Sequence, residues 1–143
     1  MKASFKTGLS FGLTSGVITT MGLMVGLHSG THSRTVVIGG IVTIAVADAL
    51  SDAMGIHIAE ESKNNGNVSE VWESTIATFL AKFLIALTFV VPVLLLSLEV
   101  AMTVSMAWGL ALLAVLSYFL AQAQQIPAWK VIAEHVVIGV SVI

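Results

Sequence analysis

The sequence contains few charged residues and no cysteine. Charged residues make up 10% of its 143 residues, against about 25% in soluble domains. The absence of cysteine excludes a disulfide framework and a thiolate metal site. The net charge of −2 offers no basic surface with which the chain could bind nucleic acid, so no such partner is expected.

Apolar surface, in contrast, is present in excess. Apolar residues make up 57% of the chain, above the usual range of about 45–50%, and the mean hydropathy is +0.99. A chain of one-domain length cannot bury this much apolar surface and still cover itself with polar groups. This excess excludes an ordinary soluble enzyme and a disordered chain. It predicts an all-α bundle in the lipid bilayer, with residues 1–143 forming a single membrane domain.

Five apolar runs predict five transmembrane helices, because a bilayer core about 30 Å thick needs about 20 apolar residues per helix. The runs cover residues 9–27, 36–58, 75–98, 101–121 and 126–143, with a short acidic loop at 59–74. We expect Pro92 to kink the third helix. The fifth run gives only about 27 Å of helix, so either it spans partly or a few C-terminal residues are missing. A signal peptide is the alternative interpretation of the first run, although that run is long for one.

Basic residues predict how the helices are oriented, because Lys and Arg concentrate in cytoplasmic loops. A cytoplasmic N-terminus places five basic residues inside and only Arg34 outside. The five are Lys2, Lys6, Lys63, Lys82 and Lys130. We therefore expect a multi-pass protein with its N-terminus in the cytoplasm and its C-terminus outside, in a prokaryotic inner membrane.

Small residues recur four positions apart in the first two predicted helices. In the first they form two runs, Gly8, Gly12 and Gly16 and later Gly22, Gly26 and Gly30. In the second they form one run, which is Gly39, Thr43, Ala47, Ser51, Gly55 and Ala59. Such stripes let helix backbones approach closely in lipid. We expect the two helices to pack face to face, or one of them to pair with its copy in a homodimer. The alternative is that glycine is simply common in membrane helices.

Two carboxylates, Asp48 and Asp52, lie inside the second apolar run. Each costs at least about 2.5–3.5 kcal/mol at mid-membrane, and a spacing of one helical turn places both on one face. They repel each other unless a cation or a proton lies between them. The pair therefore predicts a site that binds a divalent metal when ionised and carries protons when neutral. The alternative is a structural pair satisfied by Ser and Thr hydroxyls or by Lys82.

Neutral side chains in the first helix could complete a metal site. Ser15 and Thr19 offer hydroxyl oxygens, and Met21 and Met24 offer thioethers. Oxygen combined with thioether suits ferrous iron or manganese. His57, at the cytoplasmic end of the second run, is a further possible ligand. The alternative for each of these residues is ordinary packing.

Further acidic residues flank the cytoplasmic ends of the helices. Glu60, Glu61, Glu70 and Glu73 lie in or beside the loop at 59–74, where they could collect cations. The alternative is an ordinary solvated loop. Glu134, which opens the fifth run beside His135, is another possible metal ligand.

Two segments resemble the vacuolar iron transporter family. They are FGLTSGVITTMGLMVG at 11–26, like that family's first helix, and SDAMGIH at 51–57, like its second-helix motif. The resemblance implies a homodimer that moves ferrous iron or related divalent metals out of the cytoplasm in exchange for protons. In that family the metal path is lined by an Asp of the first helix and a Met of the second. Ser15 and Asp52 stand at these positions here, while Ile56 and His57 replace the family's Glu-Tyr.

Residues and resemblance together predict a divalent metal transporter that exchanges the metal for protons, rather than an enzyme. Asp48 and Asp52 would form its central site, Ser15 and Met54 would assist, and the glutamates of the loop would load it. The metal is then a transported substrate, and no resident cofactor is expected. A proton-coupled transporter of another small solute is one alternative. A non-transporting membrane scaffold is the other, and it should tolerate Asp48→Asn and Asp52→Asn.

Overall fold

The chain folds into a bundle of helices, seen in a computed structural model that describes residues 2–63 and 67–143. The described residues form helices and no strand, so the predicted all-α class is confirmed. The elements are α1 (Ala3–Thr31), α2 (Arg34–Thr43), the π-helical turn η1 (Ile44–Asp48), α3 (Ala49–Lys63), α4 (Val68–Thr88), α5 (Val90–Leu95), α6 (Leu98–Gln124) and α7 (Ala128–Ser141).

Four segments of the described chain are long and apolar enough to cross a membrane. They are α1, the continuous run from α2 to α3, the run formed by α4 and α5, and α6. The fifth expected span corresponds to α7, which has 14 residues and is about 21 Å long, shorter than the bilayer core. The helices therefore support a multi-pass membrane protein in which four of the five expected spans have sufficient length.

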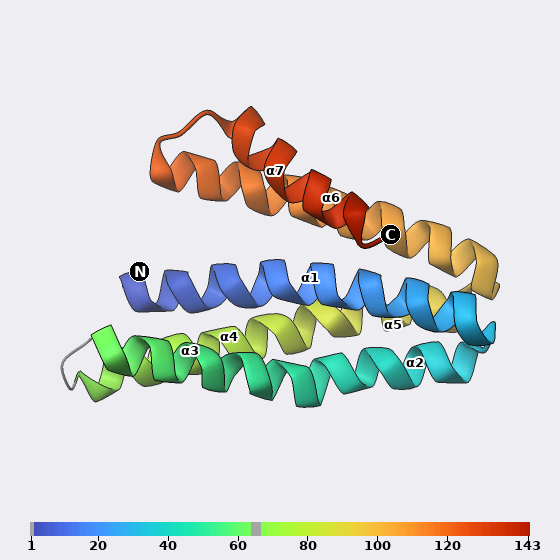
Figure 1. Cartoon of the computed structure of the whole chain (residues 1–143), viewed down its shortest axis with the longest axis horizontal. Coiled ribbons are helices and arrows are strands. Elements are labelled where there is room, and N and C mark those ends of the chain that lie inside the picture. The colour runs from blue at the N-terminus through green and yellow to red at the C-terminus, as the bar shows by residue number, and fades with distance from the viewer. Residues whose placement is uncertain (1, 64–66) are drawn as a thin grey trace.

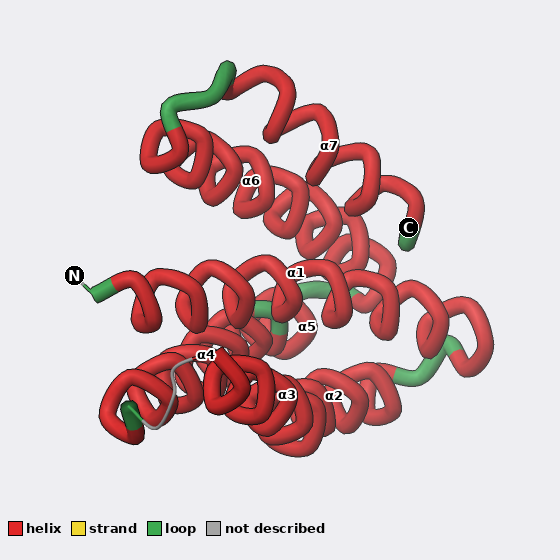
Figure 2. The backbone as a smooth tube through the Cα atoms, turned by 60° about the vertical axis from the view of Figure 1, so that its left-hand side comes forward, coloured by secondary structure: helices red, strands yellow, loops and turns green. Residues whose placement is uncertain are grey.

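Successive segments run in opposite directions along the bundle (Figure 1). The N-terminus, the end of α3, the start of α4 and the α6–α7 turn lie at one end, which we name the N-terminal end. The α1–α2 and α5–α6 connections lie at the other. The α6–α7 hairpin stands apart from the layer formed by α3 and α4, with α1 between them (Figure 2). Because α7 is short, its last residues lie beside Gly22, before the end of α1.

The glycine stripe of α1 packs against α4. A Cβ atom on Gly8 or Gly12 would lie within 3.0 Å of backbone atoms of Ser74 or Thr78. Thr78 Oγ1 also donates a hydrogen bond of 3.1 Å to the carbonyl of Gly8. For this part of the stripe, the expected contact with the second helix or with another copy is therefore wrong. The close approach is made inside the chain, to the third apolar segment.

The small-residue stripe of the second segment remains exposed. Gly39, Thr43, Ala47, Ser51 and Gly55 are exposed along α2, η1 and α3. A Cβ atom on Gly39 or Gly55 would meet nothing within 4 Å. This face can therefore accept another helix without any rearrangement of the bundle.

The kink expected at Pro92 is confirmed. Pro92 has no N–H to donate to the carbonyl of Thr88, and its ring clashes with that carbonyl in a regular helix. Accordingly α4 ends at Thr88 and α5 begins at Val90. At the far end of α5, Arg34 Nη2 donates to the carbonyl of Leu96 at 2.9 Å, which satisfies a backbone acceptor that a helix end leaves unpaired.

Candidate functional site

Four polar side chains from three segments meet at the centre of the bundle. Ser15 belongs to α1, Asp48 and Asp52 to the segment Arg34–Lys63, and Lys82 to the segment Val68–Leu95. Each of them lies near the middle of its own segment. We call these four residues the central cluster, and its position corresponds to the middle of the bilayer if the three segments span it.

Lys82 lies between the two carboxylates. Its Nζ is 2.5 Å from Asp48 Oδ2, 2.6 Å from Asp52 Oδ2 and 2.9 Å from Ser15 Oγ. Ser15 in turn donates to Asp52 Oδ2 at 2.6 Å. Lys82 thus donates hydrogen bonds to Asp52 Oδ2 and Ser15 Oγ, and it forms an ion pair with Asp48. The ammonium therefore fills the position between the carboxylates that the sequence assigned to a cation or a proton.

Burial differs sharply within the central cluster. The Lys82 side chain is 0% exposed, whereas those of Asp48 and Asp52 are 36% and 21% exposed. The Lys82 ammonium thus lies on the inner side of the central cluster. The carboxylates lie on the side that molecules around the bundle can reach. With all three groups ionised the cluster carries one net negative charge, which is expensive to hold in a low-dielectric medium. One proton or one monovalent cation would neutralise it.

The π-helical turn η1 ends at Asp48. The N–H of Ala49 donates to the carbonyl of Ile44, five residues earlier. Such turns are rare and often occur at functional sites. The additional residue turns the following helix by about 100° relative to a continuous α-helix. The direction in which Asp48 and Asp52 point therefore depends on this local irregularity.

Of the predicted ligands, only Ser15 joins the two carboxylates in the described structure. Met21 and Met24 are fully buried in the apolar core, and Thr19 donates to the carbonyl of Ser15 at 2.7 Å. Met54 is 57% exposed. Met21 and Met24 therefore pack in the core. The candidate metal ligands that remain at the central cluster are the hydroxyl of Ser15 and the carboxylates of Asp48 and Asp52.

His57 connects α3 to α4 and does not reach the central cluster. Its Nδ1 lies 2.9 Å from Thr75 Oγ1, and its ring meets that of Trp72 edge to face with centroids 4.8 Å apart. Because the Thr75 hydroxyl donates its proton to the carbonyl of Val71 at 2.7 Å, Nδ1 must donate to Thr75. This use of Nδ1 leaves Nε2 as the nitrogen of the ring that could bind a metal.

Two of the four loop glutamates are engaged in ion pairs. Glu73 accepts a hydrogen bond of 2.8 Å from Lys2, and Glu60, although buried, lies 3.4 Å from Lys63. The hydrogen bond and charge of Glu73 raise the pKa of Lys2. The Lys2–Glu73 contact therefore stabilises the fold below pH 10.5, the ordinary pKa of Lys2, and is lost as pH rises through the raised value.

The other three expected acidic ligands do not come together in one site. Glu61 and Glu134 are exposed and Glu70 is half-buried. Within residues 2–63 and 67–143, no group of three or more His, Asp or Glu side chains is placed to hold a metal ion. Any metal bound by one chain at the central cluster would therefore have two carboxylate ligands and the hydroxyl of Ser15.

Lys82 is the site residue that the sequence-based list of ligands omits. It was counted among the inside charges that set the orientation, which is wrong because it is fully buried in the middle of its segment. The basic residues that remain at the N-terminal end are Lys2, Lys6, Lys63 and Lys130. A lysine within an apolar run costs free energy on insertion, and this was the signal that could have placed it in the site.

No protein-family model, curated protein or solved structure matches the chain. The resemblance to vacuolar iron transporters therefore rests on the motifs at 11–26 and 51–57. Ser15 and Asp52, which stand at two positions of that resemblance, are joined by a hydrogen bond of 2.6 Å.

Proposed function

We propose that the chain is a membrane transporter that exchanges a cation for protons at the central cluster. The observation that carries this proposal is the meeting of Asp48, Asp52 and Lys82 midway along three segments, with Lys82 fully buried. Ionisable groups inside membrane segments mark ion pathways and proton relays. The partly exposed carboxylates give a cation or proton access to the cluster.

Charge balance defines two inexpensive states of the cluster. In the first, one carboxyl is protonated and Lys82 is an ammonium, so the total charge is zero. In the second, a divalent cation binds both carboxylates, and Lys82 withdraws as a neutral amine, which again gives zero. Moving between these states exchanges one divalent cation for two protons. Neither state leaves a net charge in the bilayer, where it would be costly.

A divalent metal such as manganese or ferrous iron is the cation that we favour. Carboxylate and hydroxyl oxygens suit these ions, and the resemblance at 11–26 and 51–57 supports the same class and an outward direction. A monovalent cation could instead bind while Lys82 stays protonated, and it would then replace a single proton. The number of protons exchanged per cation therefore distinguishes the two classes.

We also propose a cytoplasmic N-terminus and a homodimer. Four lysines remain at the N-terminal end, while Arg34 lies at the other, which favours the N-terminal end as the cytoplasmic one. The exposed small-residue stripe from Gly39 to Gly55 would be the dimer interface. It lies on the segment that carries Asp48 and Asp52, so a second copy packed there would help shield their exposed oxygens from lipid.

The direct test is cation-driven proton flux in liposomes that contain the purified protein and a pH-sensitive dye. A Mn²⁺ gradient should drive protons the other way, and Asp48→Asn or Asp52→Asn should abolish this flux. Glu134→Gln is the matched control, because Glu134 is exposed on α7 and its loss should change nothing. Flux that persists in both Asp variants would remove the central cluster from the mechanism.

A non-transporting scaffold is the second candidate, and one observation favours it. The buried Lys82 ammonium pairs with both carboxylates and donates a hydrogen bond to Ser15, as a purely structural ion cluster requires. A scaffold predicts no flux for Mn²⁺ or for a monovalent cation in wild-type liposomes. It also predicts that the Asp48→Asn variant folds and assembles as the wild type does.

A further inference from the structure

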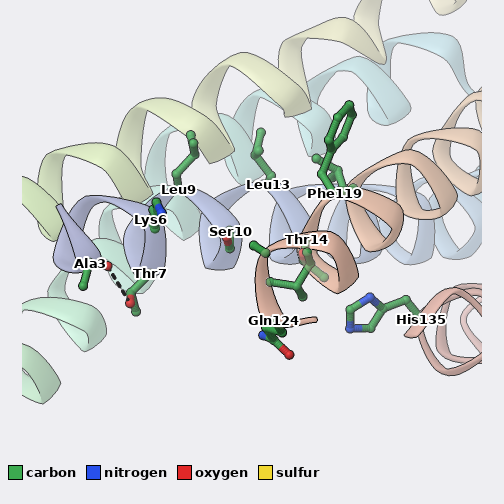
Figure 3. A pocket seen from close by; sticks show the side chains of 13 residues that line it. Ala3, Lys6, Thr7, Leu9, Ser10, Leu13, Thr14, Phe119, Gln124 and His135 are labelled. Carbon is green, nitrogen blue, oxygen red and sulfur yellow. Dashed lines mark hydrogen bonds between the residues drawn. The ribbon is translucent and has the colours of Figure 1, made fainter. Parts of the chain in front are cut away.

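A cavity lies between α1 and the α6–α7 hairpin (Figure 3). Its volume is about 750 Å³, within the range of about 300–1,000 Å³ typical of ligand sites. None of the four residues of the central cluster lines it. Its polar lining residues are Lys6, Thr7, Ser10, Thr14, Gln124 and His135.

Three of these residues form a polar line along α1. Lys6, Ser10 and Thr14 are spaced four residues apart, so they share one helix face. The side chains of these three residues make no hydrogen bond with another described residue. Thr7 and Thr19, in contrast, donate to the carbonyl four residues earlier, as hydroxyls in helices commonly do. Unpartnered polar groups are costly beside lipid, which indicates that a ligand satisfies this line.

The charge of the cavity selects the kind of ligand. No carboxylate lines it, and Lys6 has no ion-pair partner in the described part of the chain. His135 Nδ1 lies 2.7 Å from Ser117 Oγ, whose proton goes to the carbonyl of Leu113, so Nδ1 is the donor. Glu134 and Lys130, the charged neighbours of His135 on α7, are exposed and do not line the cavity. The unpaired ammonium of Lys6 therefore favours an anion.

The rest of the cavity wall is apolar. It is formed by Leu9, Leu13, Leu116, Phe119 and Leu120, together with two alanines. Lys6 lies near the start of α1 and Gln124 at the end of α6, so both lie at the N-terminal end of the bundle. Leu13 and Phe119 lie further from this end of the bundle than Lys6 and Gln124 do. The cavity thus offers a charged, polar mouth and an apolar interior, which match an anionic head and an apolar tail.

We propose that this cavity binds one anionic phospholipid, with its phosphate at Lys6 and an acyl chain along Leu13 and Phe119. The cavity is partly open beside α1 and α6, which are apolar enough to cross a membrane, so the molecules that surround it there are lipids. Lysines near a membrane surface attract anionic headgroups. This site goes beyond the proposed cation exchange, because it uses no residue of the central cluster.

Native mass spectrometry of the full chain tests this site. The protein would be released from nanodiscs that contain equal amounts of phosphatidylglycerol and phosphatidylcholine. We expect one phosphatidylglycerol to be retained preferentially. Lys6→Gln should reduce that preference about fivefold, the effect of one lysine near an anionic surface. Thr14→Phe should reduce retention of the bound lipid, because the larger side chain narrows the cavity beside the acyl chain. Lys130→Gln is the matched control, because Lys130 is exposed, lies over the Trp129 ring and does not line the cavity.

Equal retention of the two lipids by the wild type would overturn the proposal, as would equal losses in Lys6→Gln and Lys130→Gln, which indicate surface lipid. Displacement of phosphatidylglycerol by excess inorganic phosphate would show a site for a soluble anion instead. Circular dichroism on each variant confirms that the helices are intact, and Lys6 is exposed, so its replacement by Gln disturbs no packing. Lipid retention is measured without a cation gradient, so its outcome is independent of cation exchange.

Discussion

At the scale of residues, Lys82 holds the central cluster together. The sequence identified Asp48 and Asp52 from their place in an apolar run and their spacing. Lys82 and a serine hydroxyl were the expected partners in the structural alternative, and the structure places Lys82 and Ser15 beside the pair. The sequence could not decide between these partners and a bound cation, because Lys82 is 30 residues from Asp52 along the chain and belongs to another helix. The helical period predicts which residues share a face of one helix. It does not predict which face of a helix distant in the sequence will pack against that face.

Replacing Lys82 by Met should destabilise the fold strongly. Removing one partner of a buried ion pair leaves uncompensated charge and costs about 3–5 kcal/mol. Thermal unfolding in detergent should therefore show a clear loss for Lys82→Met, and adding Asp48→Asn should recover part of it by lowering the remaining charge. Lys130→Met, at an exposed position, serves as the control. A Lys82→Met variant as stable as the wild type would show that the ammonium does not hold the cluster.

At the scale of elements, the apolar runs predicted the helices well but not which stripes are buried. Repeated glycines predicted close contact between helices. Gly12 does make such a contact, but with α4 rather than with the second predicted helix. The turn η1 had no recognisable sequence pattern, because a π-helical insertion depends on tertiary packing. Helices also extend beyond the predicted spans, as α1 does from Ala3 to Thr31, since backbone hydrogen bonding continues after the apolar stretch ends.

The buried stripe predicts a stability effect for Gly12→Leu. A larger side chain would meet the backbone of Thr78, and overpacking costs about 1–3 kcal/mol or more. The thermal midpoint in detergent should fall for this variant and stay near the wild-type value for Gly26→Leu, which has open space around it and lies outside the proposed dimer interface. Equal midpoints for the two variants would contradict the packing of α1 on α4.

For the exposed small-residue stripe, in contrast, a larger side chain should weaken self-association and leave the stability of the folded chain unchanged. Gly55→Leu should leave the folded chain intact, because nothing lies within 4 Å of the added Cβ, but it should block close approach of a second copy. Chemical cross-linking in liposomes should therefore show less dimer for Gly55→Leu than for the wild type. Gly26→Leu, at an equally open position on α1, is the matched control. The proposed interface fails if Gly55→Leu cross-links as efficiently as Gly26→Leu.

At the scale of the whole molecule, composition determined the class and the charge distribution suggested the orientation. The chain has no cysteine, so single-cysteine variants can report the orientation directly. Ser69 is exposed at the N-terminal end, and Ser29 is exposed at the other end. In right-side-out vesicles, a membrane-impermeant maleimide should label Ser29→Cys and should label Ser69→Cys only after the vesicles are opened. The reverse pattern would place the N-terminus outside.

The central claim is that the cluster exchanges protons for a cation, and calorimetry of Mn²⁺ binding tests it most directly. Titrations in buffers of different ionisation enthalpy count the protons released when the metal binds. Charge balance predicts release of about two protons per Mn²⁺, lost in the Asp48→Asn, Asp52→Asn double variant. Tight binding whose heat is the same in every buffer, and which survives in the double variant, would contradict it.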